Sequence, residues 1–137
     1  MVFLQMKIFR NSKELIKLIK NYRSLGFVPT MGALHKGHIK LIKLSQKKCV
    51  NTIVSIFVNP NQFNNKNDYK RYPRNISKDL SLLKKLKIDL VFIPTKRDMY
   101  NKKRLKKIIL DNFHKKLCGK FRPGHFIGVV DIVDRFL

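Results

Sequence analysis

The segment over residues 27–38, FVPTMGALHKGH, constrains the fold of this chain more than any other stretch. It predicts a short strand, a glycine turn and a helix that opens on two histidines. A helix N-terminus presents backbone N–H groups that lack intrahelical partners, and the helix dipole adds positive charge there. His35 and His38 would add directional donors, while Gly32 and Gly37 would let an anion come close to the backbone. The segment therefore predicts a phosphate site in a nucleotide-binding α/β enzyme.

The composition fits one domain and leaves the meaning of the charge open. A chain of 137 residues with 44% hydrophobic residues is long enough to bury a core. Lys and Arg number 31 against 8 Asp and Glu, which gives a net charge of +23. Such a field attracts polyanions, but Lys, Asn and Ile also have A/T-rich codons, so a compositional bias would give the same excess. The densest cluster, residues 102–107, lacks interleaved aromatics that stack on bases, so nucleic acid is not the favoured partner.

The sequence predicts a cytoplasmic protein. Cys49 and Cys118 lie far apart, with no further cysteine at metal-binding spacing, and we expect both to be reduced thiols. No apolar run approaches the length of a membrane span, and the N-terminus does not resemble a secretory signal. We therefore expect no membrane association.

Strand-like and helix-like segments alternate, which predicts an α/β fold with a doubly wound parallel sheet. The expected elements are a helix capped by Asn11 and stopped by Gly26, a strand at 27–28 ending at Pro29, a helix from His35, a strand at 50–58, a loop at 61–74, a helix burying Leu80, Leu83 and Leu86, a strand at 90–93, and a helical turn near Asp98. Further along we expect a basic loop at 101–107, a strand at 108–110, a helix at 112–118, a loop at 121–126 and an amphipathic helix at 128–137.

Two amides follow the central expected strand, in the sequence Asn59-Pro-Asn-Gln62. Neutral amides at the carboxyl end of a parallel strand can hold a small polar acid, because they donate and accept at once. Ordinary turn chemistry is the alternative, and it explains Asn59 before a proline better than it explains Gln62. For His35 and His38 the alternative is a pair of surface or capping histidines.

Other motifs of nucleotide and metal chemistry are not supported. The sequence contains neither the P-loop pattern nor the dinucleotide-binding glycine pattern. Asp131 and Asp134 would share one face of the last helix, and without a third ligand nearby a solvated face is expected there. We assign no metal ligand in the chain.

Seven segments together resemble the pantothenate synthetase (pantoate–β-alanine ligase) family, in family order and across essentially the whole chain. They are residues 28–38, 54–63, 71–74 (RYPR), 89–94 (DLVFIP), 99–100, 117–119 and 122–129 (RPGHFIGV). The resemblance implies a Rossmann-like nucleotidyltransferase fold with an HxGH motif. It identifies residues 1–137 as the N-terminal nucleotide-binding domain, incomplete at its C-terminal end.

The resemblance also implies the chemistry of the family. ATP, with Mg²⁺, would activate pantoate as an enzyme-bound adenylate and release pyrophosphate, and β-alanine would then displace AMP to give pantothenate for coenzyme A synthesis. His38 and His35 would be the catalytic residues. The implied ATP-binding residues are Met31, Gly32, Ala33, Leu34, His35, Lys36, Gly37 and His38, and the implied pantoate and β-alanine residues are Gln62, Thr30, Met31 and Asn59.

The chain departs from the family pattern in ways that leave three readings of its role open. Family members are longer, with later lysine and arginine elements that reach the phosphates and a C-terminal lid domain. Residues 101–107 are lysine-rich where the family has a proline- and glycine-containing loop, and Lys36 is commonly acidic there. The chain is then a fragment that works with a missing C-terminal half or as a homodimer, an inactive remnant, or a basic module that binds nucleic acid.

Overall fold

The computed structural model describes residues 5–101, 131, 132 and 134–136 of the chain. It divides into two compact units. The first unit contains Met1–Phe57 and Pro73–Asp98, and the second contains Val58–Tyr72 and Met99–Leu137. Each unit is described by itself below.

The first unit is built on a four-stranded parallel sheet with the strand order β1-β4-β3-β2. The strands are β1 (Lys7–Phe9), β2 (Leu25–Thr30), β3 (Asn51–Ile56) and β4 (Leu90–Phe92). The central strand β3 pairs with β2 on one side and β4 on the other, and Val54 lies opposite both Val28 and Val91. β3 is almost wholly buried, which matches its β-branched, apolar sequence.

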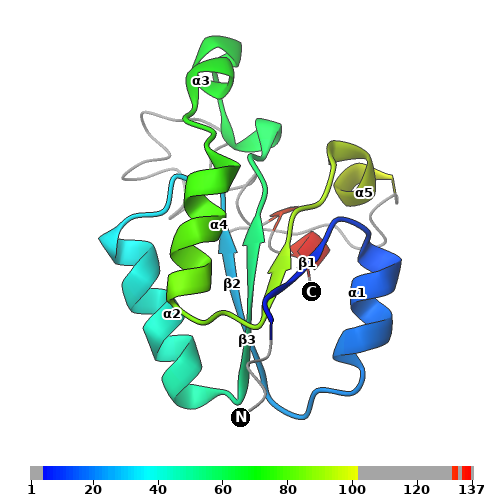
Figure 1. Ribbon diagram of the computed structural model, residues 1–137. Helices are drawn as coiled ribbons and strands as arrows, with labels where there is room; N and C mark the ends of the chain where they lie inside the picture. Colours follow the sequence, from blue (N-terminus) through cyan, green and yellow to red (C-terminus); the bar gives the residue numbers. More distant parts are fainter. Residues whose placement is uncertain (1–4, 102–130, 133, 137) are drawn as a thin grey trace, which may run out of the picture. The chain divides into compact units, whose positions relative to one another are not determined.

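Helices cover both faces of this sheet. α2 (Lys36–Lys48) connects β2 to β3, and α4 (Ile76–Lys85) lies on the connection from β3 to β4. Each connection moves the chain one strand toward the β1 edge of the sheet. Right-handed crossovers place such helices on one face. α1 (Ser12–Ile19) leads from β1 back to the far edge of the sheet, which places it on the other face (Figure 1). The predicted doubly wound parallel sheet is thereby confirmed.

A hydrophobic core lies between the sheet and the pair α2 and α4. It consists of Val28, Ile42, Val54, Ile56, Leu83, Ile88, Val91 and Ile93, with Leu34, Leu80 and Leu86 packed against it. Ile42 of α2 and Leu83 of α4 are completely buried. Side chains of this kind each stabilise the fold by about 1.5–3 kcal/mol when fully buried, so they hold the two helices on the sheet.

The described part of the second unit consists of short helical segments. η1 (Pro60–Gln62) and α3 (Lys66–Arg71) follow β3, and the residues 131, 132 and 134–136 are helical. α5 (Lys96–Tyr100) begins in the first unit and ends in the second. The start of α5 is held by its own residue Asp98, whose carboxylate accepts from both the backbone N–H and the hydroxyl of Thr95. These hydrogen bonds lower the pKa of Asp98.

Several expected boundaries were wrong around the first helix and strand. α1 begins after the Asn11 cap as expected but ends at Ile19, and Gly26 lies inside β2. A Cβ at Gly26 would fall 1.9 Å from the hydroxyl of Ser45 on α2, so the glycine permits close helix–sheet packing. Pro29 also lies inside β2, which is an edge strand among the described residues, where proline is tolerated.

In other cases an element was not expected at all or was expected to be longer than it is. β1 was not expected, and the expected loop at 61–74 contains the end of η1 and all of α3. The strand expected at 50–58 is six residues long, and Val50 is 81% exposed just before it. The expected elements between residues 102 and 130, and Cys118, lie outside the described residues. The described residues of the last expected helix are helical, and Cys49 is a free thiol.

Among the described residues, no helix combines the length and the apolar character needed to cross a membrane.

Candidate functional site

The glycine turn between β2 and α2 lies at the carboxyl end of the sheet, where open α/β folds bind their ligands. Gly32 has φ +75° and Ala33 has φ +50°, so two consecutive residues adopt the left-handed region. Glycine adopts it without cost, whereas alanine there costs roughly 1–2 kcal/mol. Thr30 fixes the start of the turn, because its hydroxyl donates to Ser55 O (2.8 Å) and accepts from Gly32 N (3.1 Å).

A carboxylate from α4 holds the middle of this turn. Asp79 is 5% exposed, and its two oxygens accept from the consecutive backbone N–H groups of Ala33 and Leu34, each at 3.0 Å. Hydrogen bonds to an ionised acceptor are roughly twice as strong as neutral ones. The turn is therefore held at both its start, by Thr30, and its middle, by Asp79.

The two histidines form a reciprocal cap on α2. His35 is the N-cap residue, and its Nδ1 accepts from Gly37 N at 3.0 Å. His38 reaches back, and its Nδ1 accepts from His35 N at 3.2 Å. The two rings lie against each other, with centroids 4.0 Å apart and planes tilted by 42°. The capping that the sequence analysis gave as the alternative to phosphate binding is thus observed, and it leaves the Nε2 atoms of both rings compatible with anion binding.

This cap determines which ring nitrogen carries the proton. A nitrogen that accepts from a backbone N–H holds a lone pair, so a neutral ring in this arrangement carries its proton on Nε2. The geometry therefore gives both His35 and His38 an Nε2–H donor on the side of the ring away from the helix backbone. His35 is exposed and His38 is half-buried.

Burial lowers the pKa of His38, and the neighbouring His35 lowers it further, while Asp79 acts in the opposite direction. A lowered pKa favours the neutral ring with its Nε2 proton at neutral pH. A bound anion beside His38 would stabilise the protonated ring and raise the pKa again. The ring is thus suited to donate to a phosphate oxygen.

The expectation of unpaired backbone amides was wrong for much of this segment. The backbone N–H groups that donate within the protein are those of Gly32, Ala33, Leu34, His35 and Gly37. The imidazole donors consequently carry more of any anion recognition than the sequence indicated. Lys36 is exposed at the first position of α2, and Met31 is half-buried at the start of the turn.

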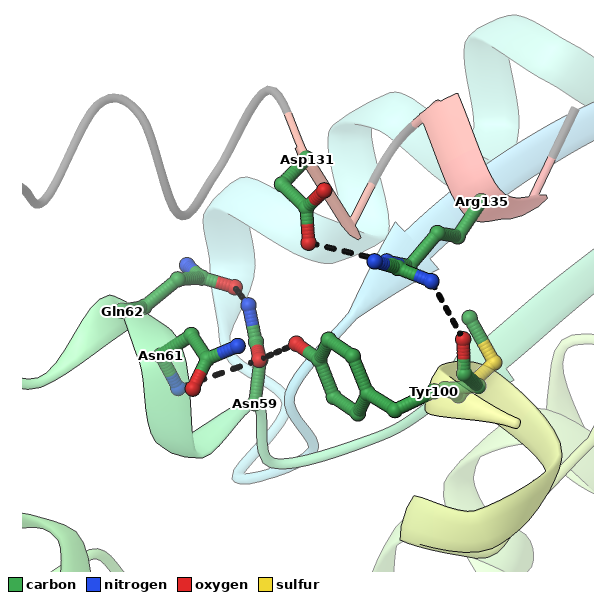
Figure 2. A network of polar contacts seen from close by, with 7 residues as sticks. Asn59, Asn61, Gln62, Tyr100, Asp131 and Arg135 are labelled. Carbon is green, nitrogen blue, oxygen red and sulfur yellow. Dashed lines mark hydrogen bonds and ion pairs between the residues drawn. The ribbon is translucent and has the colours of Figure 1, made fainter. Parts of the chain in front are cut away.

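The second unit contains a separate polar network around Asn59 and Gln62 (Figure 2). Asn59 is completely buried, and its Nδ2 donates to Gln62 Oε1 at 3.1 Å. Its Oδ1 accepts from Asn61 N at 3.2 Å and from the hydroxyl of Tyr100. Asn59 therefore orients the amide of Gln62, whose oxygen faces Asn59 and whose nitrogen lies on the other side of the group.

Tyr100 and Arg135 complete this network. Burial raises the pKa of the Tyr100 hydroxyl, with a further contribution from Asp131, so the phenol stays protonated as a donor. The Arg135 guanidinium lies 4.6 Å from the centre of the Tyr100 ring, a cation–π distance. It also pairs with Asp131 at 2.9 Å and donates to Met99 O at 3.1 Å. Asp131 is therefore an ion-pair partner in this unit.

No group of three or more His, Cys, Asp and Glu side chains within residues 5–101, 131, 132 and 134–136 has the geometry to hold a metal ion.

Sequence reasoning missed two residues that shape these sites. Asp79 lies 46 residues from Ala33, and an acidic residue in the first half of a helix ordinarily indicates only a favourable helix dipole. Tyr100 was noted as part of a motif without a role, and it contacts Asn59 across 41 residues. Neither partner is encoded by local spacing, so only the fold reveals them.

A family profile described as pantoate-β-alanine ligase matches residues 7–137. The chain belongs to this family. A pantothenate synthetase of Pseudothermotoga lettingae is 45% identical over 133 residues, and one of Clostridium botulinum is 44% identical over 135 residues. These matches cover 95% and 96% of this chain but 47% and 48% of the relatives. The chain therefore spans about half the length of the curated pantothenate synthetases that it matches.

Solved structures of the family have the same fold. A crystal structure of pantoate-β-alanine ligase from Francisella tularensis, complexed with β-γ ATP and β-alanine, matches with a TM-score of 0.90 and 42% identity. It is covered to 52% of its length, and 97% of this chain is aligned. Pantothenate synthetase from Thermus thermophilus matches with a TM-score of 0.83 and 34% identity, over 96% of this chain and 48% of that one. The nucleotidyltransferase-like α/β fold is thus shared with these ligases.

Proposed function

We propose that this chain binds ATP at the histidine cap and takes part in the ligation of pantoate and β-alanine to pantothenate, with pantoyl adenylate as the intermediate. The observation that carries this proposal is the reciprocal cap, in which both Nδ1 atoms accept from the backbone and both Nε2–H groups remain as donors. Family membership supports the substrate class.

The proposed role of the two imidazoles is to hold the phosphates and to stabilise charge as pyrophosphate leaves. Adenylation moves negative charge onto the leaving pyrophosphate, so preorganised donors lower the barrier more than any covalent help does. His38 donates a hydrogen bond to the phosphate through Nε2–H, and because the bound phosphate raises its pKa again, it can also act as the proton donor. Lys36, the first residue of α2, adds positive charge beside it. The backbone that borders ATP is formed by Met31, Gly32, Ala33, Leu34 and Gly37.

The proposed site for pantoate and β-alanine uses Gln62, Thr30, Met31 and Asn59. Gln62 is the contact residue, and Asn59 acts by orienting it. Thr30 contributes through the turn, since its hydroxyl already bonds Ser55 O and Gly32 N. The β-alanine bound in the Francisella tularensis relative supports a site for this substrate in the family.

Mg²⁺ is proposed to arrive with the triphosphate, because this ion keeps several waters and binds through substrate phosphates with few protein carboxylates. It would neutralise charge on the pyrophosphate that leaves. We propose a cytoplasmic enzyme that works as a homodimer. The segment matched here is about half as long as the relatives. Nucleic acid is not a proposed partner.

The first half-reaction tests the proposal directly. With ATP, Mg²⁺ and pantoate, the chain should release pyrophosphate, and His38→Ala should slow that release by about 10²–10³-fold, as for loss of one preorganised donor. Lys47→Ala, an exposed residue at the far end of α2, is the matched control and should leave the rate unchanged. An equal rate for His38→Ala and the control would contradict the role of His38.

A further inference from the structure

The histidine cap depends on a turn whose backbone is not intrinsically stable. Gly32 and Ala33 are both left-handed, and only the first of them is a glycine. Alanine at φ +50° persists where surrounding contacts over-determine the conformation. His35 follows this turn after a single residue, so the direction in which the turn leaves the sheet sets the position of the cap.

Asp79 supplies the contacts that over-determine this conformation. Its two oxygens bind two consecutive amides, at Ala33 and Leu34, so the carboxylate fixes the orientation of both peptide groups. It is also packed tightly against Gly32, since a Cβ there would lie 2.8 Å from Asp79 Oδ2. α4, anchored by the fully buried Leu83, carries the carboxylate. The position of the turn is thereby tied to the core through a rigid helix.

We propose that Asp79 is a positioning residue of the phosphate site: it holds the turn at residues 32–34 and through it orients the His35 and His38 donors. This role rests on the function proposed above. Asp79 acts without touching substrate, and its negative charge is compensated by the two backbone N–H groups, so it can lie near a phosphate site at a reduced electrostatic cost.

A purely structural role for Asp79 predicts a different outcome from a positioning role. If the carboxylate only stabilised α4 against the sheet, its loss would lower stability and leave the hydrogen bonds of the cap intact. If it positions the cap, its loss also loosens the hydrogen bond from His35 N to His38 Nδ1. Loss of the Asp79 charge lowers the pKa of His38 in both cases, so solvent exchange of the His35 amide and the affinity for ATP separate the two roles.

The test compares Asp79→Asn with Asp89→Asn in the full chain. Asparagine keeps the shape but replaces one accepting oxygen by a donor. Asp89 is the matched control, because its carboxylate accepts from Thr52 N at 2.9 Å near the amino ends of β3 and β4, away from the turn. The readouts are the thermal midpoint, the rate of solvent exchange of the His35 amide, and the dissociation constant for ATP.

Asp79→Asn should speed the solvent exchange of the His35 amide and weaken ATP binding by about tenfold or more, as expected when positioning is lost. Asp89→Asn should lower the thermal midpoint without either change. A folded Asp79→Asn with the wild-type exchange of the His35 amide and the wild-type ATP affinity would overturn the proposal. If the wild-type chain itself does not bind ATP, the proposed function fails, while exchange of the His35 amide, which donates to His38 Nδ1, still reports on positioning.

Two further measurements keep the proposal testable if Asp79→Asn does not fold. Gly32→Ala places a Cβ against the Asp79 carboxylate and should likewise speed the exchange of the His35 amide. In the wild-type chain, the amides of Ala33 and Leu34 should exchange slowly with solvent, because both donate to a buried carboxylate. Rapid exchange of both amides in the folded protein would overturn the proposal.

Discussion

His38 is a helix cap and, at the same time, a half-buried titratable group beside His35 and Asp79. Its Nδ1 bonds the backbone of His35, so a neutral ring presents its Nε2 proton. Burial and His35 lower its pKa below the ordinary value of 6.5, against the opposing effect of Asp79. The folded chain therefore holds this imidazole in the neutral form over a wider pH range than the unfolded chain does.

This difference predicts a pH dependence of stability. Below pH 6.5 the unfolded chain binds a proton at His38 more readily than the folded chain, so the free energy of unfolding rises with pH in that window. The contribution is present above the unfolded pKa and is lost as the pH falls through the folded one. Between about pH 7.5 and pH 5.5, denaturant unfolding should therefore show a smaller loss of stability for His38→Gln than for the wild type. Equal losses would contradict the lowered pKa.

The proposed role of Gln62 predicts which ligand loses affinity when its side chain is removed. Gln62→Ala should weaken pantoate binding more than ATP binding, because the amide is proposed to contact pantoate and lies in the second unit with Asn59. Calorimetric titration with each ligand measures both affinities, and Asn64→Ala, an exposed amide nearby in the chain, is the control. Equal losses for both ligands would indicate a folding defect and contradict the assigned contact.

At the scale of elements, α2 carries the histidines and is held on the sheet by one face. Ile42 is completely buried, whereas its neighbour Leu41 is 55% exposed. Ile42→Ala should lower the free energy of unfolding by about 2–5 kcal/mol, because it removes buried methylene groups and leaves a cavity. Leu41→Ala should change it by no more than about 0.5 kcal/mol. Urea unfolding measures both, and similar losses would contradict the assigned face.

Long periodic segments were predictable from the sequence, and short or polar elements were not. The apolar run of β3 and the histidine start of α2 are local signals, and both were found. β1 has three residues, too few to show an alternation, and α3 (KNDYKR) has no apolar stripe. The capping residue Asn65 was the one local signal for the start of α3. Gly26 was interpreted as a helix stop because the packing of Ser45 against it is not local.

At the site, the sequence predicted that His35 and His38 lie at the start of a helix but not how the turn before them is held. Their spacing was enough to indicate the cap, and the anion site stays a prediction. The engagement of the turn amides by Thr30 and Asp79 required the fold, since both partners are fixed by tertiary packing. The same holds for Asn59, whose oxygen is occupied by Tyr100 from a distant part of the chain.

At the scale of the whole molecule, the chain presents two sets of polar groups in two units. The first unit holds the turn and the histidine cap, and the second holds the amides of Asn59 and Gln62. Ligation of pantoate and β-alanine needs both a nucleotide and a small-acid site, and the chain matches about half the length of its relatives. The central proposal, made above for the function, is that these 137 residues contain the groups for both half-reactions.

The measurement that tests this claim most directly is AMP formation by the purified chain with ATP, Mg²⁺ and pantoate, with and without β-alanine. We expect AMP that depends on both pantoate and β-alanine, and its loss in His38→Ala. A folded chain that binds ATP and forms no AMP with all substrates present would contradict the claim, because the catalytic groups would then have to include residues outside this sequence.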